Sequence, residues 1–365
     1  MVTAARPPSP LAEIRGLKVR LSIALQFRVG TLPGEGSHVW RLAMTTMRAV
    51  RFSAFGPPSV LGVQTIAKPV PQAGEALVKV AASAINPSDV KFVSGVFNPT
   101  LPRTPGRDYA GTVVAASSRW AGKSVWGNGA GFGIIRDGSH AQFVAIPEDW
   151  LSEMPANLSM EQAAAIGVPF VTAWSALVVA GDVRAGETVL ITGASGAVGR
   201  AAIQIAHWKK ARVIGADINM SQDSEADIFI NTKTKDLPTM VAALTENKGV
   251  NLVLDAVGGP VFEPAMKSLG LDGRQVAITS VGSRRVEFDL MDFYHNRQRL
   301  IGVDTAKLTG VEIAAILNAL RPGFESGALR PSPVKTWPLD DAVEAYEAVA
   351  AGNASAKHIL NPQNA

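Results

Sequence analysis

The sequence contains no cysteine among its 365 residues, and it has only five histidines. Disulfides, thiolate ligands for zinc or an iron–sulfur cluster, and cysteine nucleophiles are therefore excluded. The histidines are scattered along the chain and show no spacing of the H-x-x-x-H kind, which would place two imidazoles on one metal ion. The lack of cysteine fits a reducing compartment, and we expect a cytoplasmic protein.

Long apolar runs are also missing. No window reaches the roughly 18 uncharged apolar residues that identify a membrane-spanning helix, so we expect no membrane span. Apolar residues make up 47% of the chain and charged residues 18%, a balance that is typical of a globular protein with a sizeable core. A length of 365 residues is large for a single core and favours two domains.

Excess positive charge is absent from most of the chain. The net charge is +4, and all of it lies in segment 1–46, whose arginines and lysines outnumber its two glutamates. Because the rest of the chain is balanced, we expect no nucleic-acid partner. The segment lacks the uninterrupted apolar stretch of a secretory signal. We interpret it as an N-terminal extension that is either disordered or precedes the true start at Met44 or Met47.

The pattern of secondary structure changes once along the chain. Residues 47–150 contain short runs rich in valine, phenylalanine and isoleucine, separated by glycine, proline, asparagine and serine, which predicts a β-rich region. Ser159 and Gln162 form a capping box at the start of a helix. Apolar strands and helices then alternate as far as about residue 305. This alternation predicts an α/β fold with a doubly wound parallel sheet.

A glycine-rich turn joins the first of these strands to a helix in "VLITGASGAVGRAAIQIA", residues 189–206. It resembles the dinucleotide fingerprint G-x-G-x-x-G, with Ala194 in place of the first glycine and Asp217 at the end of the next strand. A plain strand–turn–helix connection is the alternative, but the context favours a loop that binds the pyrophosphate of a dinucleotide. The candidate cofactor-binding residues in the loop are Gly193, Ser195, Gly196, Ala197, Val198 and Gly199.

From about residue 47 to 362 the chain resembles the medium-chain dehydrogenase/reductase superfamily, in particular its zinc-free quinone oxidoreductase and enoyl reductase branch. The motifs that carry this resemblance are "NPSDVK" (86–91), "TPGRDYAGTV" (104–113), "GSHAQFVAIP" (138–147), "LSMEQAAAIGVPFVTAW" (158–174), "GASGAVG" (193–199), "LDAVGG" (254–259) and "AKHIL" (356–360).

The resemblance implies a Rossmann doubly wound parallel sheet plus a GroES-like β-rich catalytic domain. We place the Rossmann domain at 169–305 and the GroES-like domain at 47–168 and 306–365. Family members are commonly dimers or tetramers that pair the edges of their Rossmann sheets. A homodimer or homotetramer is therefore expected, with the substrate bound between the two domains.

Short-chain dehydrogenases have a similar loop, but they place it near the N-terminus and use a Tyr-x-x-x-Lys pair that this chain lacks. A G-x-S-x-G nucleophile elbow is missing as well. Zinc-dependent relatives have a cysteine ligand where this chain has Asn86, and a histidine–glutamate pair where it has Arg107 and Asp108. We therefore expect no catalytic zinc.

Without a metal ion or a histidine relay, oxidation of a simple alcohol is difficult, because nothing stabilises the alkoxide. Reduction of a quinone or an α,β-unsaturated carbonyl is easier, since hydride goes to carbon and hydrogen-bond donors can stabilise the resulting enolate. We expect Asn86 to be such a donor, although its neighbours are also good turn residues. Lys91 is a candidate catalytic residue, because it stands where many quinone reductases have tyrosine. The alternative is an ordinary lysine whose side chain is solvated. Arg107 is either catalytic or part of an internal ion pair with Asp108.

Further candidates follow from the resemblance and from the topology. Thr172 is expected beside the nicotinamide carboxamide, while Val257 and Ser280 follow strand ends, where doubly wound sheets bind their ligands. Asp217 favours NADH over NADPH, because an acid at this position hydrogen-bonds the ribose hydroxyls. The sequence thus predicts an NAD(P)H-dependent, zinc-free reductase of a small quinone or enone. A dinucleotide-binding relative without turnover, redox-responsive or structural, is the alternative.

Overall fold

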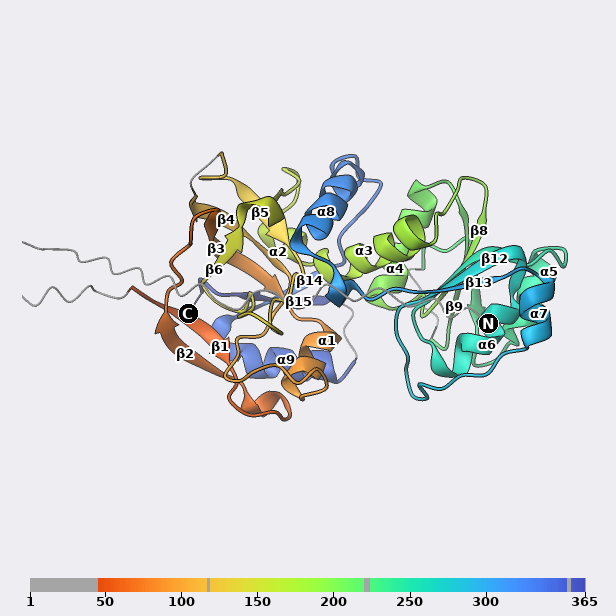
Figure 1. Cartoon of the computed structure of the whole chain (residues 1–365), viewed down its shortest axis with the longest axis horizontal. Coiled ribbons are helices and arrows are strands. Elements are labelled where there is room, and N and C mark those ends of the chain that lie inside the picture. Colours follow the sequence, from red (N-terminus) through yellow and green to blue (C-terminus); the bar gives the residue numbers. More distant parts are fainter. Residues whose placement is uncertain (1–44, 117–118, 220–223, 353–355, 365) are drawn as a thin grey trace, which may run out of the picture. The chain divides into compact units, whose positions relative to one another are not determined.

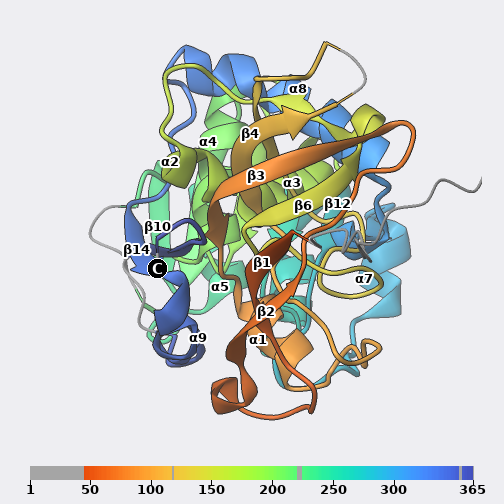
Figure 2. The same cartoon turned by 90° about the vertical axis from the view of Figure 1, so that its left-hand side faces the viewer.

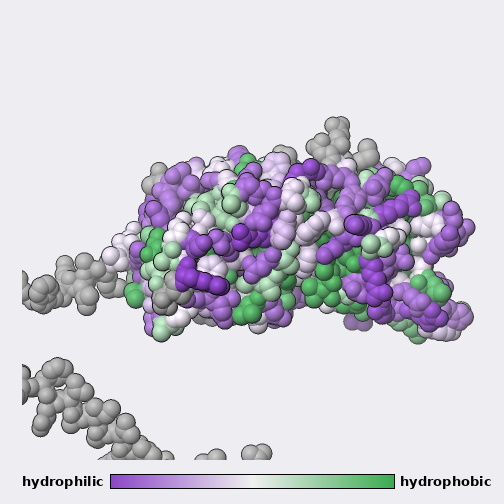
Figure 3. All heavy atoms as spheres, turned by 90° about the horizontal axis from the view of Figure 1, so that it is seen from above, coloured by the Kyte–Doolittle hydropathy of each residue, from purple (hydrophilic) through white to green (hydrophobic). Residues whose placement is uncertain are grey.

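The computed structural model describes residues 45–116, 119–219, 224–352 and 356–364. Nearly all of the proposed N-terminal extension lies outside these residues. Thr46 already belongs to strand β1 (Thr46–Arg51), where it pairs with Ala67 of β2 (Gly62–Ala67). Within the described residues, no helix combines the length and apolar character required to cross a bilayer. On the face shown in Figure 3, hydrophilic and hydrophobic residues are interspersed.

One part of the protein is built on a seven-stranded sheet with strand order β14-β15-β3-β4-β5-β7, with β6 added beside β3. Segments rich in turn residues separate its central strands in the sequence, as the pattern of residues 47–150 predicted. Strands β14 and β15 come from the C-terminal part of the chain. Figure 2 shows this sheet with β3 and β6 toward the viewer. The strands are β3 (Glu75–Ala84), β4 (Tyr109–Ala115), β5 (Ser124–Gly127), β6 (Phe143–Pro147), β7 (Ser152–Glu153), β14 (Val334–Pro338) and β15 (Lys357–Asn361).

The other part is built on a six-stranded sheet with the order β10-β9-β8-β11-β12-β13, and every neighbouring pair is parallel (Figure 1). The order reverses between β8 and β11, which confirms the doubly wound α/β fold. The alternation of strands and helices was expected to place a helix after β9, but a further strand, β10, precedes the next helix, α5. The strands are β8 (Thr188–Thr192), β9 (Arg212–Asp217), β10 (Ile228–Asn231), β11 (Val250–Asp255), β12 (Leu269–Ala277) and β13 (Arg299–Gly302).

Alternate residues of the buried strands belong to two different cores. Val189 and Ile191 pack with α3, α4 and α8, whereas Leu190 between them packs with α5 and α6. The parallel sheet is therefore covered on both faces, as its nearly continuous apolar strands require. The helices are α1 (Pro87–Val93), α2 (Met160–Ala164), α3 (Gly167–Trp174), α4 (Ala197–Trp208), α5 (Leu237–Leu244), α6 (Phe262–Lys267), α7 (Leu290–His295), α8 (Gly310–Glu325) and α9 (Ala342–Ala350).

Helix α2 begins as the sequence predicted. Ser159 accepts the backbone N–H of Gln162 at 3.2 Å, and the Gln162 side chain accepts the Ser159 N–H at 3.0 Å. Helix α3 continues directly into a π-helical turn, Ser175–Ala180. The core that contains α2, α3 and α8 also takes residues of β3, β4 and β5. These helices thus pack against both sheets, and the residue boundaries that we assign to the two domains remain a prediction.

Candidate active site

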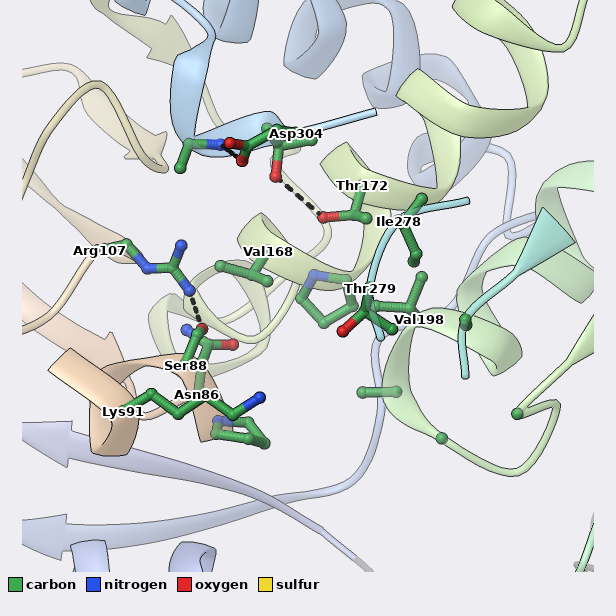
Figure 4. A pocket seen from close by; sticks show the side chains of 18 of the residues that line it. Asn86, Ser88, Lys91, Arg107, Val168, Thr172, Val198, Ile278, Thr279 and Asp304 are labelled. Carbon is green, nitrogen blue, oxygen red and sulfur yellow. Dashed lines mark hydrogen bonds between the residues drawn. The ribbon is translucent and has the colours of Figure 1, made fainter. Parts of the chain in front are cut away.

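A cavity of about 400 Å³ is lined by segments that lie near each of the two sheets. These segments are α1, the start of α3, the loop before α4, and the residues after β11, β12 and β13. Figure 4 shows these walls facing one another. The cavity brings together many of the residues that were singled out from the sequence, although they are far apart along the chain. These are Asn86, Lys91, Arg107, Thr172, Gly193, Gly196, Ala197, Val198 and Gly199.

The glycine-rich loop has the geometry that a pyrophosphate group needs. Gly193 has a φ of +65°, which favours glycine. A Cβ atom on Gly199 would lie 2.2 Å from the Gly193 carbonyl oxygen, so no other residue fits there without a backbone shift. Gly196 is the N-cap of α4, and no side chain caps this helix end. The free helix N-terminus and the close backbone approach fit a dinucleotide.

Asp217 contacts this loop directly from the end of β9. Its Oδ2 accepts the Ser195 backbone N–H at 3.0 Å, and its Oδ1 accepts the Asn219 N–H at 3.3 Å. Ser195 itself faces an adjacent cavity of about 260 Å³, which also contains Arg200 and Lys357. The carboxylate therefore lies beside the loop, on the side where a dinucleotide's ribose would be expected.

Thr172 lies on the cavity wall, and its hydroxyl is 3.3 Å from the hydroxyl of Thr305 (Figure 4). Val257 and Ser280 do not line the cavity. Their near neighbours do: Ala256, Ile278 and Thr279 form the wall after β11 and β12. The ends of β11 and β12, chosen from the topology, therefore do border the cavity. Which residue lines the cavity depends on how the chain turns after each strand.

Asn86 begins α1 and is nearly fully buried. Its Nδ2 donates to Oδ2 of Asp89 at 3.0 Å and to Oδ2 of Asp108 at 2.9 Å. Both amide hydrogens therefore point to carboxylates. No N–H of its side chain remains free in this arrangement, so donation from Asn86 to an enolate stays a prediction that this geometry does not favour. Its Oδ1 instead accepts a hydrogen bond from the ammonium of Lys357.

Arg107 forms an internal ion pair, but its partner is Asp89 and not the Asp108 of the alternative interpretation. Its Nε lies 3.1 Å from Oδ1 of Asp89, which is completely buried. The guanidinium also donates to the Ser88 hydroxyl and lies over the Phe92 ring. Because Arg107 still lines the cavity, it contributes a positively charged wall whose charge is largely balanced by Asp89.

Lys357 was missed as a site residue, although it lies within the quoted motif "AKHIL". It is the first residue of β15 and lines both cavities. Its two N–H groups other than the one bonded to Asn86 make no hydrogen bond with any described residue. Burial lowers the pKa of Lys357, an effect that the carboxylates of Asp108 and Asp89 oppose. Lys357 thus offers a positively charged donor to the cavity.

Asp108 completes this buried group of charges. It accepts hydrogen bonds from Asn86, from the Asn128 amide and from the Val168 backbone N–H. Burial raises the pKa of its carboxyl, whereas the nearby Lys357 ammonium lowers it. The sequence identified Asp108 as a position where zinc-dependent relatives have a ligand and as an ion-pair partner for Arg107, but not as part of this buried group.

The residues at this place do not fit a zinc ion. Zinc binds thiolate, imidazole and carboxylate donors, whereas here an amide, a guanidinium and an ammonium surround two carboxylates that are already hydrogen-bonded. Among the described residues, no three histidine, aspartate or glutamate side chains are grouped so that they could hold a metal ion.

Two family models match the chain. An alcohol dehydrogenase GroES-like domain matches residues 72–156, and a zinc-binding dehydrogenase domain matches residues 197–318. A zinc-type alcohol dehydrogenase-like protein of Schizosaccharomyces pombe is 36% identical over 310 residues, covering 82% of this chain and 93% of the relative. The quinone oxidoreductase of Homo sapiens is 31% identical over 324 residues, covering 86% of this chain and 97% of the human protein.

The solved structures agree with these relatives. A mycobacterial quinone oxidoreductase superimposes with a TM-score of 0.77 at 25% identity, covering 87% of this chain and 100% of the other. Together with the parallel sheet and the glycine-rich loop, these likenesses confirm the resemblance seen in the sequence. The chain belongs to the medium-chain dehydrogenase/reductase superfamily, in its quinone oxidoreductase-like branch, and is an NAD(P)H-dependent oxidoreductase.

Proposed function

We propose that this protein reduces a quinone or an α,β-unsaturated carbonyl compound without the help of a metal ion. The observation that carries the proposal is the Lys357 ammonium, which Asn86 holds at the wall of the cavity that the glycine-rich loop also lines. Bound NAD(P)H supplies the hydride. Reduction of either acceptor leaves negative charge on a carbonyl oxygen, and a positively charged donor stabilises that charge.

The buried residues around Lys357 have distinct tasks in this proposal. Asn86 orients the ammonium through its Oδ1, and its amide is fixed in turn by Asp89 and Asp108. Because Lys357 is buried, its ammonium interacts with a developing oxyanion more strongly than it would in bulk solvent. In this proposal Lys357, and not Asn86, donates the hydrogen bond to the oxyanion, and Asn86 is a positioning residue.

The acceptor panel that tests the function consists of 1,4-benzoquinone, 9,10-phenanthrenequinone and a simple enone, each with NADH and with NADPH. We expect at least one acceptor to be reduced, and we expect the rate to survive prolonged dialysis against a strong chelator. Cofactor binding without consumption of any acceptor would instead support a dinucleotide-binding protein without turnover. Stoichiometric zinc whose removal abolishes the rate would contradict metal independence.

We propose NADH as the preferred reductant, on the position of Asp217. The basic residue on the same strand, Arg212, begins β9 and donates to the Leu244 carbonyl, whereas Asp217 ends the strand. A six-residue strand spans roughly 16–20 Å, so Arg212 is too far from this carboxylate to neutralise it. A 2′-phosphate at this place would meet the negative charge of Asp217.

We also propose that two copies associate through strand β13. It is the end strand of the parallel sheet, and it follows α7, in which no residue is buried. Exposed backbone at a sheet edge pairs readily with a second strand, and a twofold axis makes this pairing self-complementary. Light scattering should then give two or four times the chain mass of 38.3 kDa, and a Leu300→Lys change should shift the mass toward one chain. Nearby exposed apolar residues are Val281, Leu290, Met291, Tyr294 and Leu300.

A further inference from the structure

Among the described residues, one cation of the cavity has no neighbouring group that balances its charge. Arg107 pairs with Asp89, and Lys357 lies beside Asp108. The ammonium of Lys91, by contrast, makes no hydrogen bond or ion pair with any described residue. Its side chain is exposed and lines the cavity, and Figure 4 shows it extending from α1 into the space between the walls.

The acidic side chain on the cavity wall does not compensate Lys91. Asp304 is the acidic residue among the described lining residues, and its Oδ1 accepts the Ala306 backbone N–H at 3.0 Å. Figure 4 shows Asp304 on the wall opposite Lys91. Lys91 is therefore a free cation at a site that must also admit an acceptor molecule.

The surface next to Lys91 suits a flat conjugated molecule. Phe92 follows Lys91 in α1, and its ring centroid lies 4.3 Å from that of Phe97. Both rings line the cavity, together with Val168, Ile278 and Val303. Aromatic and aliphatic side chains contact the faces of planar ligands, and a few charged groups set their orientation.

We propose that the natural acceptor carries an anionic group, such as a carboxylate, sulfonate or phosphate, and that Lys91 binds this group. The inference rests on the proposed function and specifies its substrate class. The conjugated part of the acceptor lies against the exposed ring of Phe97 and the aliphatic side chains of the cavity, while Lys91 holds its anionic group by a charge-assisted hydrogen bond. Lys91 thus determines which acceptors are used, and Lys357 acts on the carbonyl that is reduced.

A matched pair of acceptors tests this assignment: 1,2-naphthoquinone and 1,2-naphthoquinone-4-sulfonate, which differ in one anionic group. The measured quantity is the ratio of kcat/KM for the sulfonate to kcat/KM for the neutral quinone, at low ionic strength and saturating NADH. We expect Lys91→Met to lower this ratio about 10-fold or more and Lys91→Arg to retain most of it. Added salt should reduce the ratio of the parent.

The control is Lys79→Met, which removes an exposed lysine of β3 that lines neither cavity and should leave the ratio unchanged. A ratio that does not respond to Lys91→Met would overturn the inference. If Lys91 served the cofactor's phosphates instead, Lys91→Met would raise the dissociation constant for NADH and leave the ratio unchanged. Failure of the parent to reduce either quinone or the enone would count against the proposed function itself.

Discussion

Replacement of Lys357 by methionine should lower kcat about 100-fold, which is the usual effect of losing one oxyanion-stabilising donor. Methionine keeps most of the length and apolar volume of the lysine stem but carries no charge and no N–H. The dissociation constant for NADH, measured by fluorescence without an acceptor, should change much less than kcat. This contrast separates a role at the carbonyl from a role in binding the cofactor's phosphates, because the latter would raise the dissociation constant instead.

The pH dependence gives a second readout for the same residue. Lys357 must be protonated to act, so kcat of the parent should fall as the pH rises through its pKa, which burial lowers from the usual value. The charged groups that surround it are Asp108, Asp89 and Arg107. This fall of kcat at high pH should be missing in Lys357→Met and should occur at higher pH in Lys357→Arg. A parent and variant with parallel pH profiles would show that another group donates to the oxygen.

Asp217→Ser should shift the ratio of kcat/KM values strongly toward NADPH. A carboxylate about 4 Å from a phosphate charge, at an effective dielectric constant of about 20, costs roughly 4 kcal/mol before screening. Removal of most of that repulsion corresponds to a change of about 100-fold or more in the NADPH/NADH ratio. The measurement is kcat/KM for both cofactors at one fixed quinone concentration.

The Ser195 N–H bond makes a control for Asp217 necessary, because loss of the carboxylate also frees this part of the loop. Asp217→Asn keeps an oxygen that can accept from Ser195 but removes the charge, so it should shift the ratio nearly as far as serine does. If asparagine behaves like aspartate and only serine changes the ratio, the effect comes from the loop contact. A parent that already prefers NADPH would show that the carboxylate does not face the ribose.

Local patterns explain which parts of the fold could be predicted. The strand, the loop and the helix around Gly199 are adjacent in sequence, so periodicity and turn residues were sufficient to identify them. Helix α7 was not identified, because it has only six residues, too few for a distinct helical period, and its apolar residues are not buried. Strand β10 has only four residues, too few for a distinct period.

The buried charges of the site depend on contacts that no local pattern contains. Ile359 of β15 pairs with Ala84 of β3, and only this pairing brings Lys357 beside Asn86. The motif "AKHIL" was visible in the sequence, but its lysine had no assigned partner. The direction of the Asn86 amide could not be predicted for the same reason, since it is set by two carboxylates and an ammonium from three separate segments.

The place of β15 in the chain has a consequence for biosynthesis. All strands of the parallel sheet lie between residues 188 and 302 and can assemble as soon as they leave the ribosome, because domains fold as units during synthesis. Lys357 emerges after all of these strands, and its strand must then close a very long loop to reach β3. A nascent or prematurely terminated chain would therefore possess the glycine-rich loop while still lacking the ammonium, so it could hold a dinucleotide before it could use one.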